Sequence, residues 1–157
     1  MDTPADNPYA GWKTLPSWLL GQTASYAGRF VSDGFSAVGA RGYHYRLLAT
    51  LDEFGPASQA ELGRRSHIHL SDMVATINEL ADSELVRRAP DPADRRRNII
   101  SLTSDGERRL RRLQKQLAKS QEALLEPLSP EERAQLSQLL TRLLEFHEQR
   151  AGAEGDG

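Results

Sequence analysis

Apolar residues recur at helical spacing in the first third of the chain. One stripe consists of three residues that are seven and four positions apart, Leu19, Tyr26 and Phe30. A second stripe, spaced by four and three, consists of Tyr43, Leu47, Leu51 and Phe54. These stripes predict an amphipathic helix over about 15–35 and a second helix over about 41–54. Gly55 and Pro56 are a stop signal for the second helix.

Two shorter helices are predicted next. Ser58-Gln-Ala-Glu61 is a capping box, in which the serine oxygen and the glutamate carboxylate accept hydrogen bonds from backbone amides of the first turn. A helix should therefore begin at Ser58 and end near Arg65 or Ser66. Helical spacing resumes in four apolar residues, Met73, Ile77, Leu80 and Ala81. This spacing predicts a helix from about 70 to 83, and two helices joined by a short turn form a helix-turn-helix candidate.

A hairpin is predicted after these two helices. The segments LVRRA (85–89) and NIISL (98–102) are plausible strands, and the proline-containing stretch between them is a turn. Three consecutive arginines, Arg95 to Arg97, then lie at the hairpin tip. Helix, turn, helix, hairpin is the element order of a winged helix.

The last third of the chain predicts two more amphipathic helices. Thr103 can cap the first, which carries an apolar stripe at Leu110, Leu113, Leu117 and Leu124. Ser129-Pro-Glu-Glu132 is a capping box for the second, whose apolar face consists of Leu136, Leu139, Leu140, Leu143 and Leu144. A single winged module offers the apolar faces of these helices little surface to pack against, so we expect them to pack against another subunit.

The predicted fold class is mainly α with a small β-hairpin wing (α+β), a winged helix-turn-helix with N- and C-terminal dimerisation helices. We expect one domain over 13–150. Its DNA-binding lobe should span about 41–103, and its dimerisation helices about 14–35 and 104–149. The ends, 1–12 and 151–157, are expected to be flexible because they hold prolines, small residues and no sustained periodicity.

Composition narrows the function. The 157 residues include no cysteine, which excludes disulfides, thiolate zinc sites and cysteine nucleophiles. No phosphate-binding glycine loop, His-Glu metal helix or nucleophile-elbow serine is present, so we do not expect an enzyme. No signal peptide or membrane-length apolar run is found, so we expect a cytoplasmic protein without a membrane partner.

Charge is distributed unevenly along the chain, although the formal net charge is only −2. Residues 85–112 hold nine arginines and four acids, a balance of +5. Residues 121–157 hold three arginines and eight acids, a balance of −5. The hairpin region therefore suits an anionic partner, whereas the acidic C-terminal helix would repel phosphate.

The segments QAELGRRS, DMVATINEL, LVRR and DPADRRRNIISLTSDG, in this order, resemble the MarR family of bacterial winged helix-turn-helix regulators. The resemblance implies a homodimer that binds palindromic double-stranded DNA, mostly as a repressor, with many members released by a small molecule. The chain departs from the family in two ways. Glu84 stands where the family usually has glycine after the recognition helix, so the backbone either avoids the left-handed region there or is modestly strained. The recognition helix also carries no arginine.

Candidate DNA contacts fall into three groups. By resemblance, Arg96 inserts into the minor groove and Asp94 pairs with it, while Arg95 and Arg97 face phosphate or solvent. Base contacts would come from the recognition helix and the turn before it, through His67, His69, Leu70, Ser71, Asp72 and Thr76. Phosphate contacts would come from Ser58, Gln59, Arg64, Arg65, Arg87 and Arg88. The competing interpretations are a solvated hairpin turn, simple helix caps at His69 or Ser71, and ordinary surface charge.

Two further sites are predicted. By resemblance, a small-molecule effector would bind between the dimerisation helices and the winged module, where Trp18, Tyr26, Phe30, Tyr43 and His44 are candidates, unless these aromatic residues are plain core. His67 and His69, with His44 or His147, could seed a zinc site, although two-residue spacing on a turn is a weak signal. No other cofactor is predicted. Alternative functions are a zinc-responsive regulator of the same fold and a winged-helix protein-interaction module that does not bind DNA.

Overall fold

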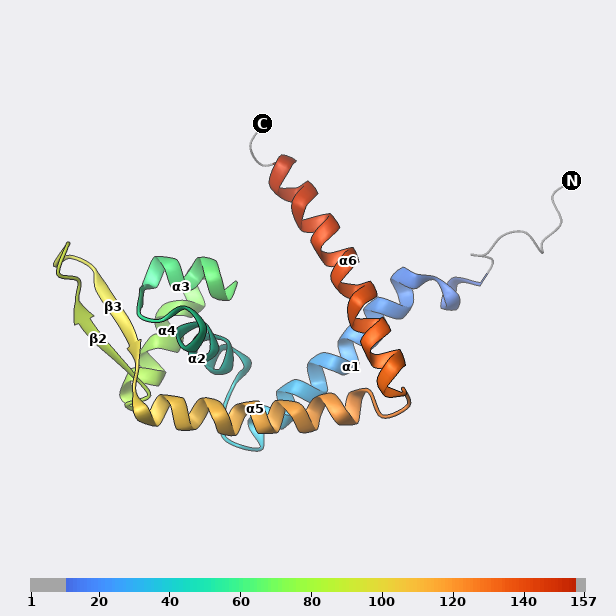
Figure 1. Cartoon of the computed structure of the whole chain (residues 1–157), viewed down its shortest axis with the longest axis horizontal. Coiled ribbons are helices and arrows are strands. Elements are labelled where there is room, and N and C mark those ends of the chain that lie inside the picture. Colours follow the sequence, from blue (N-terminus) through green and yellow to red (C-terminus); the bar gives the residue numbers. More distant parts are fainter. Residues whose placement is uncertain (1–10, 155–157) are drawn as a thin grey trace, which may run out of the picture. The chain divides into compact units, whose positions relative to one another are not determined.

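The computed structural model describes residues 11–154, which form two units that divide between Gln121 and Glu122. The helices, labelled in Figure 1, are α1 (Pro16–Ser36), α2 (Gly42–Phe54), α3 (Gln59–Ser66), α4 (Leu70–Asp82), α5 (Ser104–Leu124) and α6 (Pro130–Glu154), after a short 3-10 turn η2 (Trp12–Thr14). The strands are β1 (Ala57–Ser58), β2 (Val86–Pro90) and β3 (Asn98–Leu102). The predicted winged helix-turn-helix is confirmed. The flexibility expected of 1–10 and 155–157 concerns residues outside those described.

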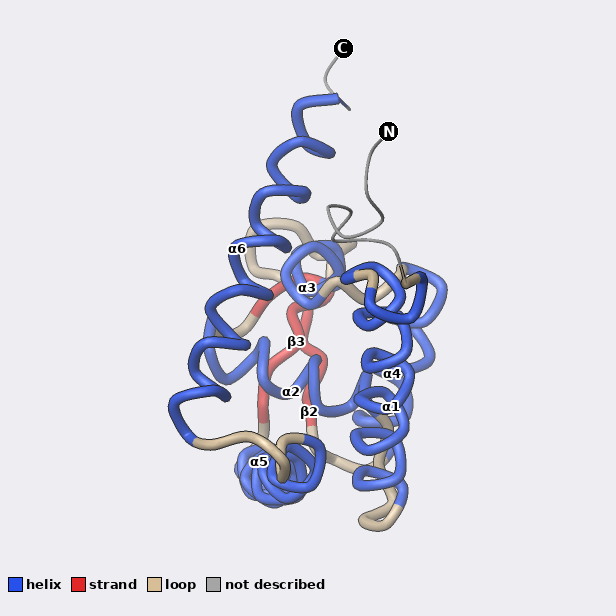
Figure 2. Tube along the Cα trace, turned by 90° about the vertical axis from the view of Figure 1, so that its right-hand side faces the viewer, coloured by secondary structure: helices blue, strands red, loops and turns tan. Residues whose placement is uncertain are grey.

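The sheet is three-stranded and antiparallel, in the order β1-β3-β2. Val86 pairs with Leu102 at the root of the wing, and Pro90 pairs with Asn98 near its tip. The strand β1 was not predicted, because two residues are too short for any periodicity. Ala57 and Ser58 pair with Ile100 and Ile99, so β1 joins the start of α3 directly to the wing. Figure 2 shows the three strands together in red.

A single core holds the winged module together. Its buried side chains come from α2, α3, α4, the sheet and α5, and include Leu47, Leu48, Leu62, Met73, Ile77, Leu80, Val86, Ile100, Leu110 and Leu113. Phe35 at the end of α1 is also buried and stacks on Tyr45 with ring centroids 5.5 Å apart. The helix-turn-helix and the wing therefore share one hydrophobic base.

The caps that the sequence predicts at the starts of α3 and α5 are present in the structure. The Ser58 hydroxyl accepts a hydrogen bond from the Glu61 amide (3.3 Å), and the Glu61 carboxylate accepts one from the Ser58 amide (3.0 Å). Thr103 caps α5 by accepting from the Gly106 amide at 3.0 Å. All three hydrogen bonds link residues three apart, so they depend only on local sequence.

The recognition helix α4 is followed by a left-handed residue, directly after its C-cap Ser83. Glu84 has φ of 57°, and its amide donates to the Ala81 carbonyl while the Leu85 amide donates to the Leu80 carbonyl (2.9 Å each). This is a Schellman motif in which glutamate occupies the position that favours glycine. Of the two alternatives raised by the sequence, the strained one is correct.

The second unit consists of the end of α5, a loop and α6. The predicted capping box at Ser129 and Glu132 is confirmed, with backbone-to-side-chain bonds of 2.8 and 3.2 Å. Arg133 fixes the loop by donating to the carbonyls of Leu125 and Leu128 at 3.1 Å each. The helix continues to Glu154, past the end expected near 149. Among the helices of residues 11–154, none is long and apolar enough to cross a membrane.

Candidate nucleic-acid interface

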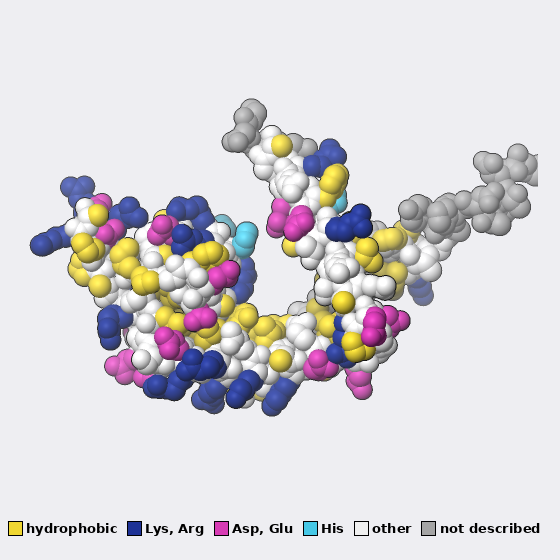
Figure 3. Space-filling view, viewed as in Figure 1, with side chains coloured by type: hydrophobic (Ala, Val, Ile, Leu, Met, Phe, Trp, Pro, Cys, Tyr) yellow, Lys and Arg dark blue, Asp and Glu magenta, His cyan; other side chains and the backbone are white. Residues whose placement is uncertain are grey.

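The tip of the wing, Asp91 to Arg97, is folded by its own hydrogen bonds. The Asp91 amide donates to the Arg97 carbonyl (2.8 Å), and the Arg97 amide donates to the Asp94 carbonyl (3.0 Å). The Asp91 carboxylate accepts from the Ala93 amide at 2.9 Å. All three arginines are exposed, and Figure 3 shows Lys and Arg side chains in dark blue at this tip. An ordered backbone thus presents three cations to solvent.

The predicted pairing of Asp94 with Arg96 takes a different form. The Asp94 carboxylate accepts a hydrogen bond from the Arg96 backbone amide at 3.0 Å. No ion pair between this carboxylate and the Arg96 guanidinium is found among the described residues. Asp94 therefore orients the backbone of the tip and leaves the guanidinium free, because an aspartate at the start of a turn bonds preferentially to the amide two residues on.

A cleft of about 340 Å³ lies between the wing and the two helices of the helix-turn-helix. It is lined by Ser58, Gln59, Ala60, Leu70, Arg96, Arg97 and Asn98. The structure thus brings together residues that the sequence assigned separately to phosphate, base and wing contacts. The first amides of α3, which have no intrahelical acceptor, and two guanidinium groups make this cleft suitable for phosphate.

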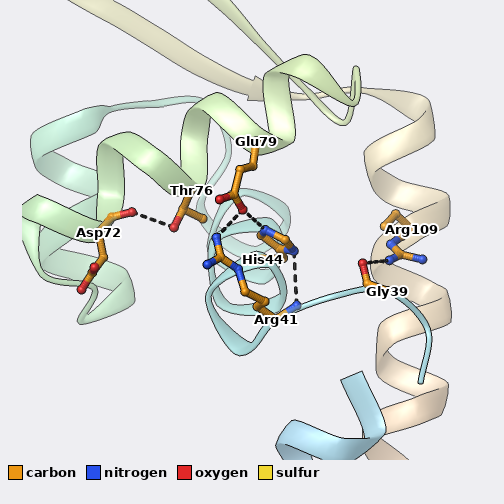
Figure 4. A network of polar contacts seen from close by, with 7 residues as sticks. All are labelled: Gly39, Arg41, His44, Asp72, Thr76, Glu79 and Arg109. Atoms are coloured by element: carbon orange, nitrogen blue, oxygen red, sulfur yellow. Dashed lines mark hydrogen bonds and ion pairs between the residues drawn. The ribbon is translucent and has the colours of Figure 1, made fainter. Parts of the chain in front are cut away.

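Two residues that the sequence predicted to contact DNA have other roles in the structure. Ser58 is buried, and its hydroxyl and amide are both used in the capping box, so its role is to start α3. Thr76 is only 1% exposed, and its hydroxyl donates to the Asp72 carbonyl at 2.7 Å (Figure 4). Thr76 is three residues from Met73 and four from Leu80, so it belongs to the buried face of α4. Neither side chain is available to DNA.

The start of α4 is open to solvent. Leu70 is 63% exposed, and His69 and Ser71 are exposed and lie 3.1 Å apart (Nδ1 to Oγ). His69 occupies the N-cap position of α4, as the capping interpretation expects, but its side chain makes no capping hydrogen bond. Val74, which sequence reasoning missed, is 46% exposed one turn after Leu70. Its position off the core stripe was the available signal, and the pair suits thymine methyl groups.

Arg46, also missed, holds the turn between α3 and α4. Its guanidinium donates to the carbonyls of Ser66 (2.6 Å) and His67 (2.8 Å). His67 has φ of 52°, a left-handed conformation that these bonds stabilise. The His67 side chain is exposed, as is Asp72 in part. The contact from α2 to this turn is long-range, so the sequence offered no sign of it.

The remaining cationic candidates differ in their surroundings. Arg64 and Arg87 are exposed. Arg65 lies over the ring of Phe54, 5.0 Å from its centroid. Arg88 on β2 donates to the Asn78 side chain on α4, which ties the wing to the recognition helix. Arg65 and Arg88 therefore contribute to packing within the lobe as well as to its charge.

A group of three polar residues joins α2 to the far half of α4 (Figure 4). The Glu79 carboxylate accepts from the Arg41 guanidinium and lies 2.6 Å from Nε2 of His44. Hydrogen bonds from His44 and then Arg41 lower the pKa of Glu79. Nearby, Arg109 of α5 donates to the carbonyls of Val38 (2.7 Å) and Gly39 (3.1 Å), and its partial burial lowers its pKa.

A cavity of about 600 Å³ lies between α1 and the start of α2. It is lined by Ala27, Gly28, Val31, Ser32, Phe35, Ser36, Ala40, Arg41, Gly42 and Tyr43. Of the five predicted effector residues, Tyr43 alone belongs to this lining. The face of α1 toward this cavity, its inner face, carries Ala27, Val31 and Phe35. Successive side chains of an α-helix point about 100° apart around its axis, so a residue one position away points elsewhere.

The other four effector candidates do not line this cavity, and their assignment stays a prediction. Tyr26 and Phe30 are 55% and 39% exposed, because they lie one position before the inner face of α1. Trp18 packs edge-on against Trp12, with ring centroids 5.4 Å apart. His44 faces α4, as described above. The alternative that these aromatic residues are plain core is wrong for Tyr26 and Phe30, because both are exposed.

Within residues 11–154 no group of three or more histidine, aspartate or glutamate side chains could hold a metal ion. His69 contacts Ser71, and His44 is occupied by Arg41 and Glu79. Within the first unit the structure therefore does not bring His44 together with His67 and His69.

The described geometry defines a winged helix-turn-helix protein with a basic wing tip and an exposed recognition-helix start. Residues 43–97 match the model of the MarR family. The chain is 32% identical over 99 residues to the uncharacterized HTH-type transcriptional regulator YxaD of Bacillus subtilis, covering 63% of this chain and 69% of that one. The chain belongs to the MarR family and is a DNA-binding transcriptional regulator.

Two further similarities are informative. The HTH-type transcriptional repressor NicR of Pseudomonas putida is 39% identical over 59 residues, which is 38% of this chain and 37% of that one. BpsR of Bordetella bronchiseptica, whose DNA binding is regulated by 6-hydroxynicotinic acid, has a structure with a TM-score of 0.74 and 20% identity over 87% of this chain and 97% of that one. At 20% identity, the similarity to BpsR shows a shared fold.

Proposed function

We propose that the protein is a dimeric repressor that binds a pseudo-palindromic operator and is released from it by a small-molecule effector. The observation that carries the DNA-binding part is the cleft at Gln59, Leu70, Arg96 and Arg97, where the wing, the start of α3 and the start of α4 meet. The cytoplasm is the compartment in which such a protein would act.

In this proposal Arg96 enters the minor groove, because its guanidinium is exposed on an ordered tip and the groove's negative potential attracts arginine. Leu70, Ser71 and Val74 contact base edges in the major groove. The remaining predicted residues contact phosphate or the edge of the interface: Gln59, Arg64, Arg65, His67, His69, Asp72, Arg87, Arg88, Arg95 and Arg97.

Dimerisation is supported by exposed apolar side chains on both helices assigned to it. They include Leu19 and Tyr26 on α1, and Leu139, Leu143, Leu144 and Phe146 on α6. Large exposed apolar side chains in such number are typical of a surface that a second copy covers. Two-fold symmetry would place the two recognition helices about one DNA turn apart, roughly 34 Å.

The cavity between α1 and α2 is the proposed effector site. Its lining is mostly apolar, and Arg41 is its one charged residue. This chemistry suits a small apolar molecule with one anionic group. The regulation of BpsR by 6-hydroxynicotinic acid supports an aromatic acid of this kind as the ligand.

Selection of bound DNA from a random pool tests the proposal, with and without chelator and with and without 6-hydroxynicotinic acid. We expect a palindromic consensus that does not depend on chelator. Failure to enrich any sequence would overturn the operator proposal and favour a protein-interaction module, and loss of enrichment in chelator would revive the zinc alternative.

A further inference from the structure

The recognition helix is joined to the start of α2 by Arg41, His44 and Glu79, which we call the latch. We propose that the latch holds α4 in its operator-binding orientation, and that an organic anion in the cavity between α1 and α2 opens it by taking Arg41 from Glu79. The second half of this inference rests on the effector site proposed above. The first half concerns DNA binding without any ligand.

Glu79 is the acceptor at the centre of the latch. One oxygen, Oε2, accepts from the Arg41 guanidinium and lies 2.6 Å from Nε2 of His44 (Figure 4). Arg41 is the N-cap residue of α2, His44 belongs to the first turn of α2, and Glu79 belongs to the third turn of α4. The latch is therefore a direct polar link between the cavity-lining end of α2 and the DNA-reading helix.

His44 is fixed in one tautomer by its neighbours. Its Nδ1 accepts a hydrogen bond from the Arg41 backbone amide at 3.3 Å, so in the neutral ring the proton is on Nε2. That proton points to the Glu79 carboxylate. If the Arg41 side chain leaves, His44 still donates to Glu79, and the link weakens without breaking completely.

Arg41 belongs to both sites. It contributes to the lining of the 600 Å³ cavity and pairs with Glu79. Its side chain is 56% exposed, so turning the guanidinium from one carboxylate to another requires little desolvation. A carboxylate ligand can offer Arg41 a bidentate pair, which the shared Glu79 oxygen does not. An anion in the cavity therefore competes with Glu79 for the same guanidinium.

Opening the latch should move α4 without unfolding it. Met73, Ile77 and Leu80 remain buried in the shared core, and Asn78 remains bonded to Arg88 of the wing. Only the Arg41 part of the polar contact between α4 and α2 is lost, and the contact of His44 with Glu79 remains. The binding of a ligand can change the position of a helix by a small reorientation of this kind, because packed interfaces shift between discrete arrangements.

The first test uses Glu79→Ala, with Asp82→Ala as its matched control. Both residues are acids on α4, and Asp82 is exposed and makes no ion pair among residues 11–154. Loss of a negative charge alone strengthens DNA binding. We expect Glu79→Ala to weaken operator binding about fivefold or more, while Asp82→Ala binds equally well or more tightly. Equal or tighter binding by Glu79→Ala would overturn the latch.

The second test uses Arg41→Gln and Arg41→Lys with 6-hydroxynicotinic acid and its neutral amide as probes. The wild-type protein should lose operator affinity in the acid and not in the amide. Arg41→Gln should bind operator weakly and show no further change, whereas Arg41→Lys, which keeps a cation beside Glu79, should retain operator affinity. Unchanged melting temperatures and dimer sizes are the controls for folding.

The outcomes separate the two proposals. If the wild-type protein ignores the acid while Glu79→Ala still binds weakly, the proposed effector is overturned and the positioning role of the latch is supported. A response of Arg41→Gln to the acid equal to that of the wild type would overturn the competition for Arg41.

Discussion

Arg96 is the residue whose surroundings most favour direct DNA contact. Its backbone is fixed by Asp94, and its side chain is exposed. We expect Arg96→Ala to weaken operator binding about tenfold or more, since a well-placed contact contributes about 1–3 kcal/mol. A gel-shift or fluorescence titration measures this, with the dimer size as a control.

Arg95→Ala is the matched comparison on the same tip. If Arg95 only faces phosphate, its loss should weaken specific and non-specific DNA alike. Equal effects of the two substitutions on sequence preference would contradict the special role given to Arg96.

Glu84 predicts a gain of stability by substitution. Because its φ of 57° is costly for an L-residue and ordinary for glycine, Glu84→Gly should raise the free energy of unfolding by about 1 kcal/mol. Ser83→Gly is the control, since Ser83 has φ of −87° and gains nothing from glycine. Urea denaturation of the three proteins decides the sign.

At the residue scale the sequence predicted capping well and exposure less well. The boxes at Ser58 and Ser129 depend on residues three apart, which a single chain displays directly. Thr76 shared the buried stripe with Met73 and Leu80, so its burial was predictable from helical phase. The contact of Arg46 with Ser66 joins residues 20 apart, and no local pattern announces it.

Among the elements, the start of α5 is packed tightly against the root of the wing. A methyl group on Gly106 would overlap the carbonyl oxygen of Leu85 and press on the Leu102 side chain. We expect Gly106→Ala to lower the free energy of unfolding by about 1–3 kcal/mol. Gly21→Ala is the control, because nothing lies within 4 Å of its added methyl and alanine favours the helix. Thermal unfolding of both variants should shift in opposite directions.

The capping box of α3 predicts how stability responds to acid. Hydrogen bonds from Ser58, first from its backbone and then from its side chain, lower the pKa of Glu61 below 4.5 in the folded chain. The stability that the carboxylate contributes is therefore present above the unfolded pKa and is lost as the pH falls through the folded pKa. We expect the free energy of unfolding to fall below about pH 4.5, and to fall less steeply in Glu61→Gln. A pH series of denaturation curves measures both, and parallel curves would contradict the assignment.

Sequence periodicity predicts the buried face of some helices and not of others. The phases of α2, α4 and α5 were predicted because their apolar residues face one core. In α1 the large residues Tyr26 and Phe30 suggested the inner face, yet the smaller Ala27 and Val31 line the cavity. Size misled the prediction because the outer face of α1 is itself apolar.

For the whole molecule, the basic segment counted along the chain divides in space. The wing arginines lie at the tip, whereas Arg111 and Arg112 of the same segment are exposed on α5, as are Lys115 and Lys119 just after it. Figure 3 shows Lys and Arg side chains in dark blue along α5. We therefore expect an operator to contact only part of the positive charge that the sequence displays.

The salt dependence of operator binding measures that part. If a dimer neutralises roughly six to ten phosphates, affinity should fall about a thousandfold or more between 50 and 200 mM salt. Arg97→Ala should reduce the slope, and Lys119→Ala should leave it unchanged. A slope that changes with Lys119 would place α5 against DNA.

The pairing of β1 with β3 has an entropic consequence. Because Ser58 both ends this strand and begins α3, the wing root cannot swing independently of the helix-turn-helix. The tip is ordered by its own hydrogen bonds before any DNA arrives. Little conformational freedom of the backbone then remains to be lost on association, so the free energy of each new contact is kept for affinity.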